Sequence, residues 1–133
     1  MELFFRGVVF TSTGLLASLL SQFFGGFDML LQTLVLFMAV DLISGLISAA
    51  VFKKISSRAG IKGLFKKGSC LLLIVVAVHL DALLGTNSLT RDAVIIAFCL
   101  NELISILENM GKIGIKMPAP IIDALEILSK KKA

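Results

Sequence analysis

The stretch that decides the fold runs from Asp28 to Lys67: DMLLQTLVLFMAVDLISGLISAAVFKKISSRAGIKGLFKK. Its first part, Met29 to Phe52, is apolar and carries a single charge at Asp41. About 20 apolar residues cross a bilayer, so this run predicts a transmembrane helix. A segment with only basic charges follows, and we expect it to be a cytoplasmic loop that sets the topology. Its basic residues are Lys53, Lys54, Arg58, Lys62, Lys66 and Lys67.

The composition supports one small membrane domain that covers residues 1–133. Hydrophobic residues make up 57% of the chain, and the mean hydropathy is +0.99, which is too apolar for an ordinary soluble domain. The net charge of +4 could indicate nucleic-acid binding. The basic residues flank apolar spans, however, where cytoplasmic retention and attraction to anionic lipid explain them better. We therefore expect anionic membrane lipids as partners and no nucleic acid.

The residue types that carry catalysis or bind metals are sparse. Cys70 and Cys99 lie inside apolar runs without CxxC spacing, so we expect them to pack as small hydrophobic residues. His79 is the only histidine, and His79-x-Asp81 alone is a weak metal signal. With no evident nucleophile–base pair or metal cluster, the sequence predicts a protein that is not an enzyme and needs no cofactor.

Hydropathy and turn signals predict an all-α integral membrane protein. It has four transmembrane helices at about residues 7–27, 29–52, 69–85 and 92–111. The first carries small or polar residues every three or four positions and no cleavable signal, so an uncleaved span is favoured over an interfacial helix. Pro118 and Pro120 then break the chain before an amphipathic tail, residues 118–133, that should lie on the membrane surface.

The topology follows from the count of spans. Four spans with a cytoplasmic loop between the second and third place the N and C termini in the cytoplasm. Further lysines then fall on the cytoplasmic side near the C-terminus, and Arg91 is the basic residue left outside. This asymmetry agrees with the retention of basic residues in the cytoplasm.

Polar residues inside the second span share one helical face with Asp41: Ser44, Gly45 and Ser48. A charged Asp at mid-membrane costs about 2.5–3.5 kcal/mol, so Asp41 should face protein or water or be neutral. Two interpretations stay open. Asp41 is either a neutral carboxyl hydrogen-bonded between helices or a group that lines a pore.

The fourth span carries a polar stripe at steps of four, with two carboxylates beside it. These residues are Asn101, Glu102, Ser105, Glu108 and Asn109. The mid-span positions of Asp41 and Glu102 bring them to one depth in the bilayer, where they can hydrogen-bond within or between subunits. Asp81 lies near the outer surface, and we expect it to pair with Arg91 across a short turn.

Several short patterns occur in a characteristic order. Asp41, Gly45 and Ala49 form D-x-x-x-G-x-x-x-A, and Leu80-Asp81 and Arg91 follow the basic loop. The most specific segment begins at residue 101, N-E-x-x-S-I-x-E-N, and the prolines at 118 and 120 come after it. From about Ala39 to Leu128, the chain resembles the toxin secretion/phage lysis holin family of Gram-positive phages and prophages.

The resemblance implies a function. Similar proteins oligomerise in the bacterial cytoplasmic membrane and form lesions through which an endolysin or a toxin crosses, which leads to host cell lysis. The implied partners are other copies of the chain, an endolysin as cargo and an antiholin. The alternative is a small oligomeric ion or proton channel, or a transporter, that uses intramembrane carboxylates.

Overall fold

The computed structural model describes residues 1–132 and shows five helices and, within those residues, no strand. The helices are α1 (Glu2–Phe23), α2 (Met29–Val51), α3 (Ser57–Leu84), α4 (Leu89–Ile113) and α5 (Ala119–Lys132). The first four are long and apolar enough to cross a membrane. The predicted fold class is therefore confirmed: this is an all-α, multi-pass membrane protein with a short C-terminal helix.

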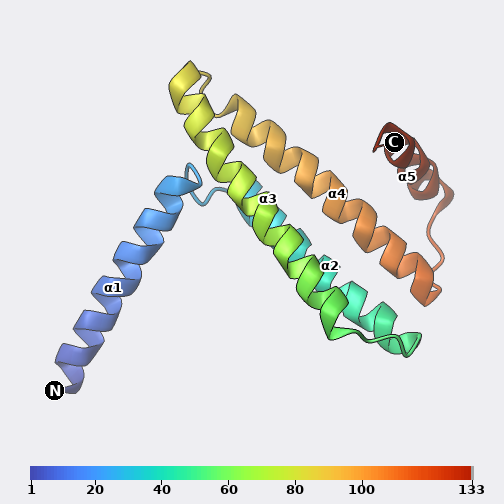
Figure 1. Cartoon of the computed structure of the whole chain (residues 1–133), viewed down its shortest axis with the longest axis horizontal. Coiled ribbons are helices and arrows are strands. Elements are labelled where there is room, and N and C mark those ends of the chain that lie inside the picture. The colour runs from blue at the N-terminus through green and yellow to red at the C-terminus, as the bar shows by residue number, and fades with distance from the viewer. Residues whose placement is uncertain (133) are drawn as a thin grey trace.

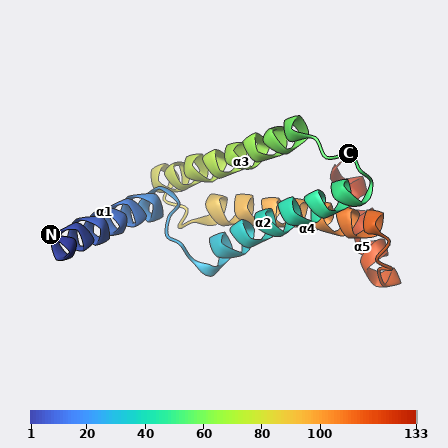
Figure 2. The same cartoon turned by 90° about the horizontal axis from the view of Figure 1, so that it is seen from below.

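The helices α2, α3 and α4 form the body of the molecule, and α4 packs against both of the others. Figures 1 and 2 show these three helices running side by side. Three fully buried aliphatic side chains, Leu34, Ile74 and Ile95, come one from each helix and form the centre of the packing. In lipid, such side-chain packing holds helices together, because lipid tails are as apolar as the side chains.

The helix α1 points away from this body (Figure 1) and has no buried residue. Its hydroxyl groups are satisfied within the helix: Thr11, Ser12 and Thr13 each donate to the carbonyl four residues earlier, at 2.7–2.8 Å. Such internal bonds let hydroxyl residues face lipid without unsatisfied donors. The chain then turns through Gly25 and Gly26, whose φ values of +71° and +103° suit glycine.

The third helix begins at Ser57 rather than near Ser69, which corrects the expected basic loop. Ser56 caps it by accepting a hydrogen bond from the Ala59 amide at 3.4 Å. The connector keeps Lys53 and Lys54, whereas Arg58, Lys62, Lys66 and Lys67 belong to α3. The glycines of this segment resemble loop signals, but isolated glycines are tolerated in a helix at a modest cost.

Candidate functional site

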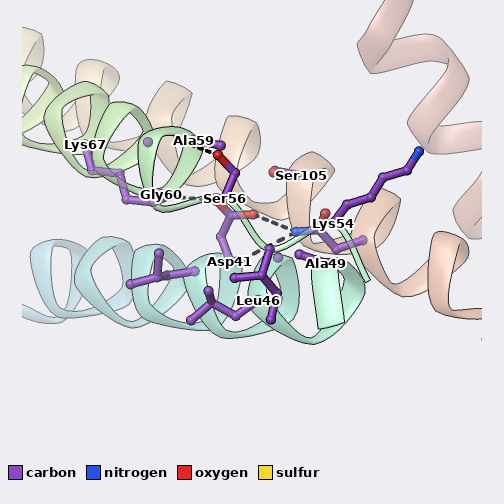
Figure 3. A pocket seen from close by; sticks show the side chains of 14 residues that line it. Asp41, Leu46, Ala49, Lys54, Ser56, Ala59, Gly60, Lys67 and Ser105 are labelled. Carbon is purple, nitrogen blue, oxygen red and sulfur yellow. Dashed lines mark hydrogen bonds and ion pairs between the residues drawn. The ribbon is translucent and has the colours of Figure 1, made fainter. Parts of the chain in front are cut away.

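A buried cluster of charged and polar side chains joins the three helices of the body. Lys67 of α3 lies between Asp41 of α2 and Glu102 of α4 (Figure 3 shows the first two). Its Nζ is 2.7 Å from Asp41 Oδ2 and also forms an ion pair with Glu102 Oε2. The three side chains are only 14%, 15% and 7% exposed. One cation thus holds carboxylates from two other helices.

Neutral polar groups of α2 and α4 complete the hydrogen bonding of Asp41. Asn109 Nδ2 donates to Asp41 Oδ1 at 3.2 Å and to Ser44 Oγ at 3.1 Å. Ser44 Oγ donates in turn to the Asp41 carbonyl at 3.0 Å, and Ser105 lies within hydrogen-bonding reach of the Asp41 carboxylate. Among the described side chains, no buried nitrogen or oxygen lacks a partner. Buried ion pairs require such additional bonds to offset their loss of water.

The electrostatics of the cluster are unbalanced. It contains two carboxylates and one ammonium, which leaves one excess negative charge when all three groups are ionised. An uncompensated charge is expensive in a membrane interior unless protein dipoles or water stabilise it. The amide of Asn109 and the hydroxyl of Ser105 supply such dipoles here.

A pocket of about 250 Å³ lies beside the cluster and is lined by α2, α3 and α4 (Figure 3). Its polar lining includes Asp41, Lys67 and Asn109, and it extends to Lys54 and Ser56 in the α2–α3 connector. Small residues leave this space open, since Gly45 of α2 and Gly60 of α3 both line it. The buried charges are therefore close to a hollow that leads toward one end of the body.

The structure brings together five of the predicted residues, which are Asp41, Ser44, Glu102, Ser105 and Asn109, and Gly45 lies against Asn109. The other predicted residues lie elsewhere. Ser48 is buried on α2, farther along toward the connector, Glu108 is exposed, and Asn101 lines a different groove between α3 and α4. The prediction missed Lys67 as a member of the cluster, because that residue had been assigned to a loop.

Asp81 and Arg91 occupy the opposite end of α3 and α4, and their pairing differs from the expected one. Asp81 is buried and caps α4, since it accepts hydrogen bonds from the Thr90 and Arg91 amides at 2.9 and 2.8 Å. The Arg91 guanidinium instead binds both carboxylate oxygens of Asp28, at 2.8 and 3.0 Å. The expected side-chain pair is therefore wrong, because the carboxylate of Asp81 is directed to the orphan amides of the helix start.

The Arg91 guanidinium also fixes the turn between α1 and α2. It donates to the carbonyls of Phe24 and Gly26, at 2.6 and 3.1 Å. A further bond reaches the Asp92 carboxylate at 2.8 Å. The hydrogen bonds from Arg91 lower the pKa of Asp28 below its ordinary value of 3.8. This network, called here the Arg91 clamp, ties the α1–α2 turn to the start of α4.

The remaining candidate groups have packing roles. Cys99 belongs to the hydrophobic core and Cys70 packs against that core, as expected for small hydrophobic residues. His79 Nδ1 lies 2.9 Å from the Val75 carbonyl, and its ring stacks on Phe23. Within residues 1–132, no three His, Cys, Asp or Glu side chains converge in a way that could hold a metal ion.

Comparison with known proteins assigns this arrangement to a family. Residues 18–130 match the sequence profile of a family described as the bacteriophage holin family. An uncharacterized protein of Listeria monocytogenes is 43% identical over 108 residues, which cover 81% of this chain and 77% of that protein. The probable holin of Bacillus phage phi105 is 35% identical over 89 residues, which cover 67% of this chain and 66% of that protein.

A third relative comes from Clostridium perfringens. This uncharacterized 14.9 kDa protein is 36% identical over 118 residues, which cover 88% of this chain and 89% of that protein. No solved structure matches the chain significantly.

Proposed function

The chain belongs to the bacteriophage holin family, and we propose that it acts as a holin. Copies of the chain oligomerise in the cytoplasmic membrane and open lesions through which an endolysin or a toxin crosses. Lysis of the host cell follows when the endolysin reaches the cell wall. In this role the protein does no covalent chemistry, and its partners are other copies of itself and its cargo.

The buried cluster is the observation that best supports this proposal. Four spans per chain are too few to enclose a wide hole, so a lesion requires many copies. Polar backbone and side-chain groups are tolerated at membrane depth where protein buries them or where they face a water-filled cavity. Asp41, Lys67 and Glu102 are buried within one chain. When helices separate during assembly, the same groups gain water and become part of the lesion wall.

The orientation in the membrane is part of the proposal. One end of the body is rich in basic residues. It holds the start of α3 together with Lys53, Lys54, Lys112 and Lys116. Basic residues beside spans resist translocation, so this end is placed in the cytoplasm. Both chain termini are then cytoplasmic, and the Arg91 clamp lies near the outer surface.

Timed induction together with a cytoplasmic endolysin tests the proposed function. A holin releases the folded endolysin, and with it a cytoplasmic reporter enzyme, only after a delay during which the membrane stays intact. The control is the endolysin expressed without this chain, which should leave the cells turbid. Accumulation of the chain in the membrane without endolysin release would contradict the proposal.

A second candidate function is a small ion or proton channel, and the geometry around Lys67 favours it. Two carboxylates share one ammonium beside a pocket that reaches the α2–α3 connector, an arrangement suited to moving a proton or a cation. Such a channel would dissipate ion gradients from the start of expression and would never release a folded protein. Ion leak and reporter release, followed in one culture, distinguish the two functions.

A further inference from the structure

A second groove is lined by none of the residues of the buried cluster. It has a volume of about 540 Å³ and is formed by α3, α4 and α5. Its walls are mainly apolar, with Phe98 and Ile104 from α4 and Leu128 from α5. This volume lies within the range of about 300–1,000 Å³ that is typical of ligand sites.

Two lysines border this groove. Lys66 of α3 and Lys131 of α5 both line it, and none of its described lining residues is acidic. Both lysines are exposed, and neither ammonium forms an ion pair with a carboxylate within residues 1–132. Lys66 and Lys67 are neighbours in sequence but serve different surfaces, because Lys67 turns inward to Asp41 and Glu102.

The groove combines a cationic border with apolar walls. Lys66 lies one residue before Lys67, so its backbone is close in depth to the buried cluster, and Cys70 of α3 and Ala97 of α4 continue the groove from there. The long side chain of Lys66 can extend its ammonium toward the headgroups, while the apolar walls continue into the membrane. Ammonium groups that reach the membrane surface attract anionic headgroups, whereas the apolar walls suit an acyl chain.

We infer that this groove binds one anionic phospholipid, with its phosphate between Lys66 and Lys131 and an acyl chain between α3 and α4. The lipid comes from the leaflet next to the α2–α3 connector and joins α5 to the body. This site is independent of the buried cluster and goes beyond the proposed holin function. Each lysine should contribute about a fivefold preference for anionic lipid, which corresponds to about 1 kcal/mol per basic residue.

Native mass spectrometry of the purified full chain tests this inference. The chain is placed in nanodiscs with equal amounts of phosphatidylglycerol and phosphatidylcholine, and the lipid retained on release is counted. The wild type should retain phosphatidylglycerol preferentially. Lys66→Gln/Lys131→Gln should lose most of that preference. The matched control, Lys53→Gln/Lys54→Gln, changes the net charge equally and should keep the preference.

The reactivity of Cys70, which lines the groove, gives an independent readout in a Cys99→Ala background. Alkylation of Cys70 in micelles should slow severalfold when phosphatidylglycerol is added, and inorganic phosphate alone should not slow it. Three results would each overturn the inference. They are equal retention of the two lipids by the wild type, an equal loss of lipid preference in the two double-lysine variants, and protection of Cys70 by phosphate alone. If the inference fails but the chain still releases endolysin normally, the proposed holin function stands.

Discussion

Two ionic networks connect the helices: the Arg91 clamp at the start of α4 and the buried cluster along its second half. Each consists of one cation and two carboxylates. The carboxylates of the buried cluster, Asp41 and Glu102, are 15% and 7% exposed. Arg91 binds the carboxylates of Asp28 and Asp92, which are 50% and 46% exposed. The carboxylates are therefore largely shielded from solvent at one site and about half exposed at the other.

The two networks also bind different parts of the chain. Lys67 joins side chains of three helices, so it contributes to the packing of α2, α3 and α4. Arg91 binds backbone carbonyls at Phe24 and Gly26, so it fixes a turn. The planar guanidinium can donate several bonds in fixed directions, whereas an ammonium acts as a compact charge. We therefore expect changes at the buried cluster to cost more than changes at the clamp.

The largest effect is expected for Lys67→Met, which leaves two carboxylates buried without their cation. Breaking a buried pair by removing one partner costs about 3–5 kcal/mol. The unfolding midpoint of the purified protein in detergent, monitored by circular dichroism, should fall strongly. The neighbouring substitution Lys66→Met is the control and should change it little, because Lys66 is exposed. Equal midpoints for the two variants would show that the cluster does not stabilise the body.

A smaller effect is expected for Arg91→Lys, which keeps the positive charge but removes the planar guanidinium and several of its N–H donors. Several hydrogen bonds are weakened rather than lost, and a bond to a charged group contributes a net stability of about 1.5–3 kcal/mol. Because Asp28 stays partly solvated, the loss should be below that of Lys67→Met. Limited proteolysis should also become faster at the Gly25–Gly26 turn. Arg58→Lys, in the exposed first turn of α3, should leave both measurements unchanged.

A still smaller stability effect is expected for Asp41→Leu or Glu102→Leu, because Lys67 keeps one partner in each variant. Hydrogen bonds between membrane helices average about 0.6 kcal/mol. We expect normal amounts of protein in the membrane fraction, but an altered oligomer distribution or an altered time of lysis with endolysin present. If immunoblot, crosslinking and lysis time all match the wild type in both variants, the two carboxylates are tolerated but not used.

The smallest effect concerns the pH dependence of the clamp. Arg91 lowers the pKa of Asp28, so the folded protein binds the Asp28 proton less tightly than the unfolded chain does. The resulting stability is fully present above the ordinary value of 3.8 and is lost as the pH falls through the lowered value. Its size should be about 0–1 kcal/mol, because water reaches the pair. Unfolding midpoints below pH 4 should therefore fall slightly more for the wild type than for Asp28→Asn.

The sequence predicted the spans and part of the site because both depend on regular spacing. The apolar runs indicated four membrane helices, and the depth of Asp41 and Glu102 within their spans correctly brought them together. The face that each helix turns inward is harder to predict, since neither hydropathy nor charge counts specify it. Glu108 and Asn109 are adjacent, yet Glu108 is exposed and Asn109 joins the cluster.

The roles of Lys67 and Arg91 were missed for a related reason. Lysines beside a span usually extend toward water, and the glycines around Lys67 resemble a loop. A signal was nevertheless present: Lys67, Ile74 and Asp81 recur at steps of seven and so share one face of a continuous helix. Ile74 and Asp81 are both buried, and Lys67 is largely so. The Arg91 clamp left no comparable pattern, because its acceptors include backbone carbonyls from a distant turn.

The proposed function requires that the cluster is shielded within each subunit before lysis and exposed to water in the lesion. Ser44, 1% exposed and bonded to Asn109, reports on it directly. The test uses a variant in which Cys70 and Cys99 are replaced by Ala and Ser44 is replaced by Cys. The variant is induced together with endolysin, and labelling of the new cysteine by a membrane-impermeant thiol reagent is followed from induction until after lysis. We predict no labelling before lysis begins and rapid labelling afterwards, whereas Leu72→Cys on the apolar surface of α3 stays unlabelled throughout. Ser44→Cys that remains unlabelled after lysis, or is labelled equally before it, would contradict the account.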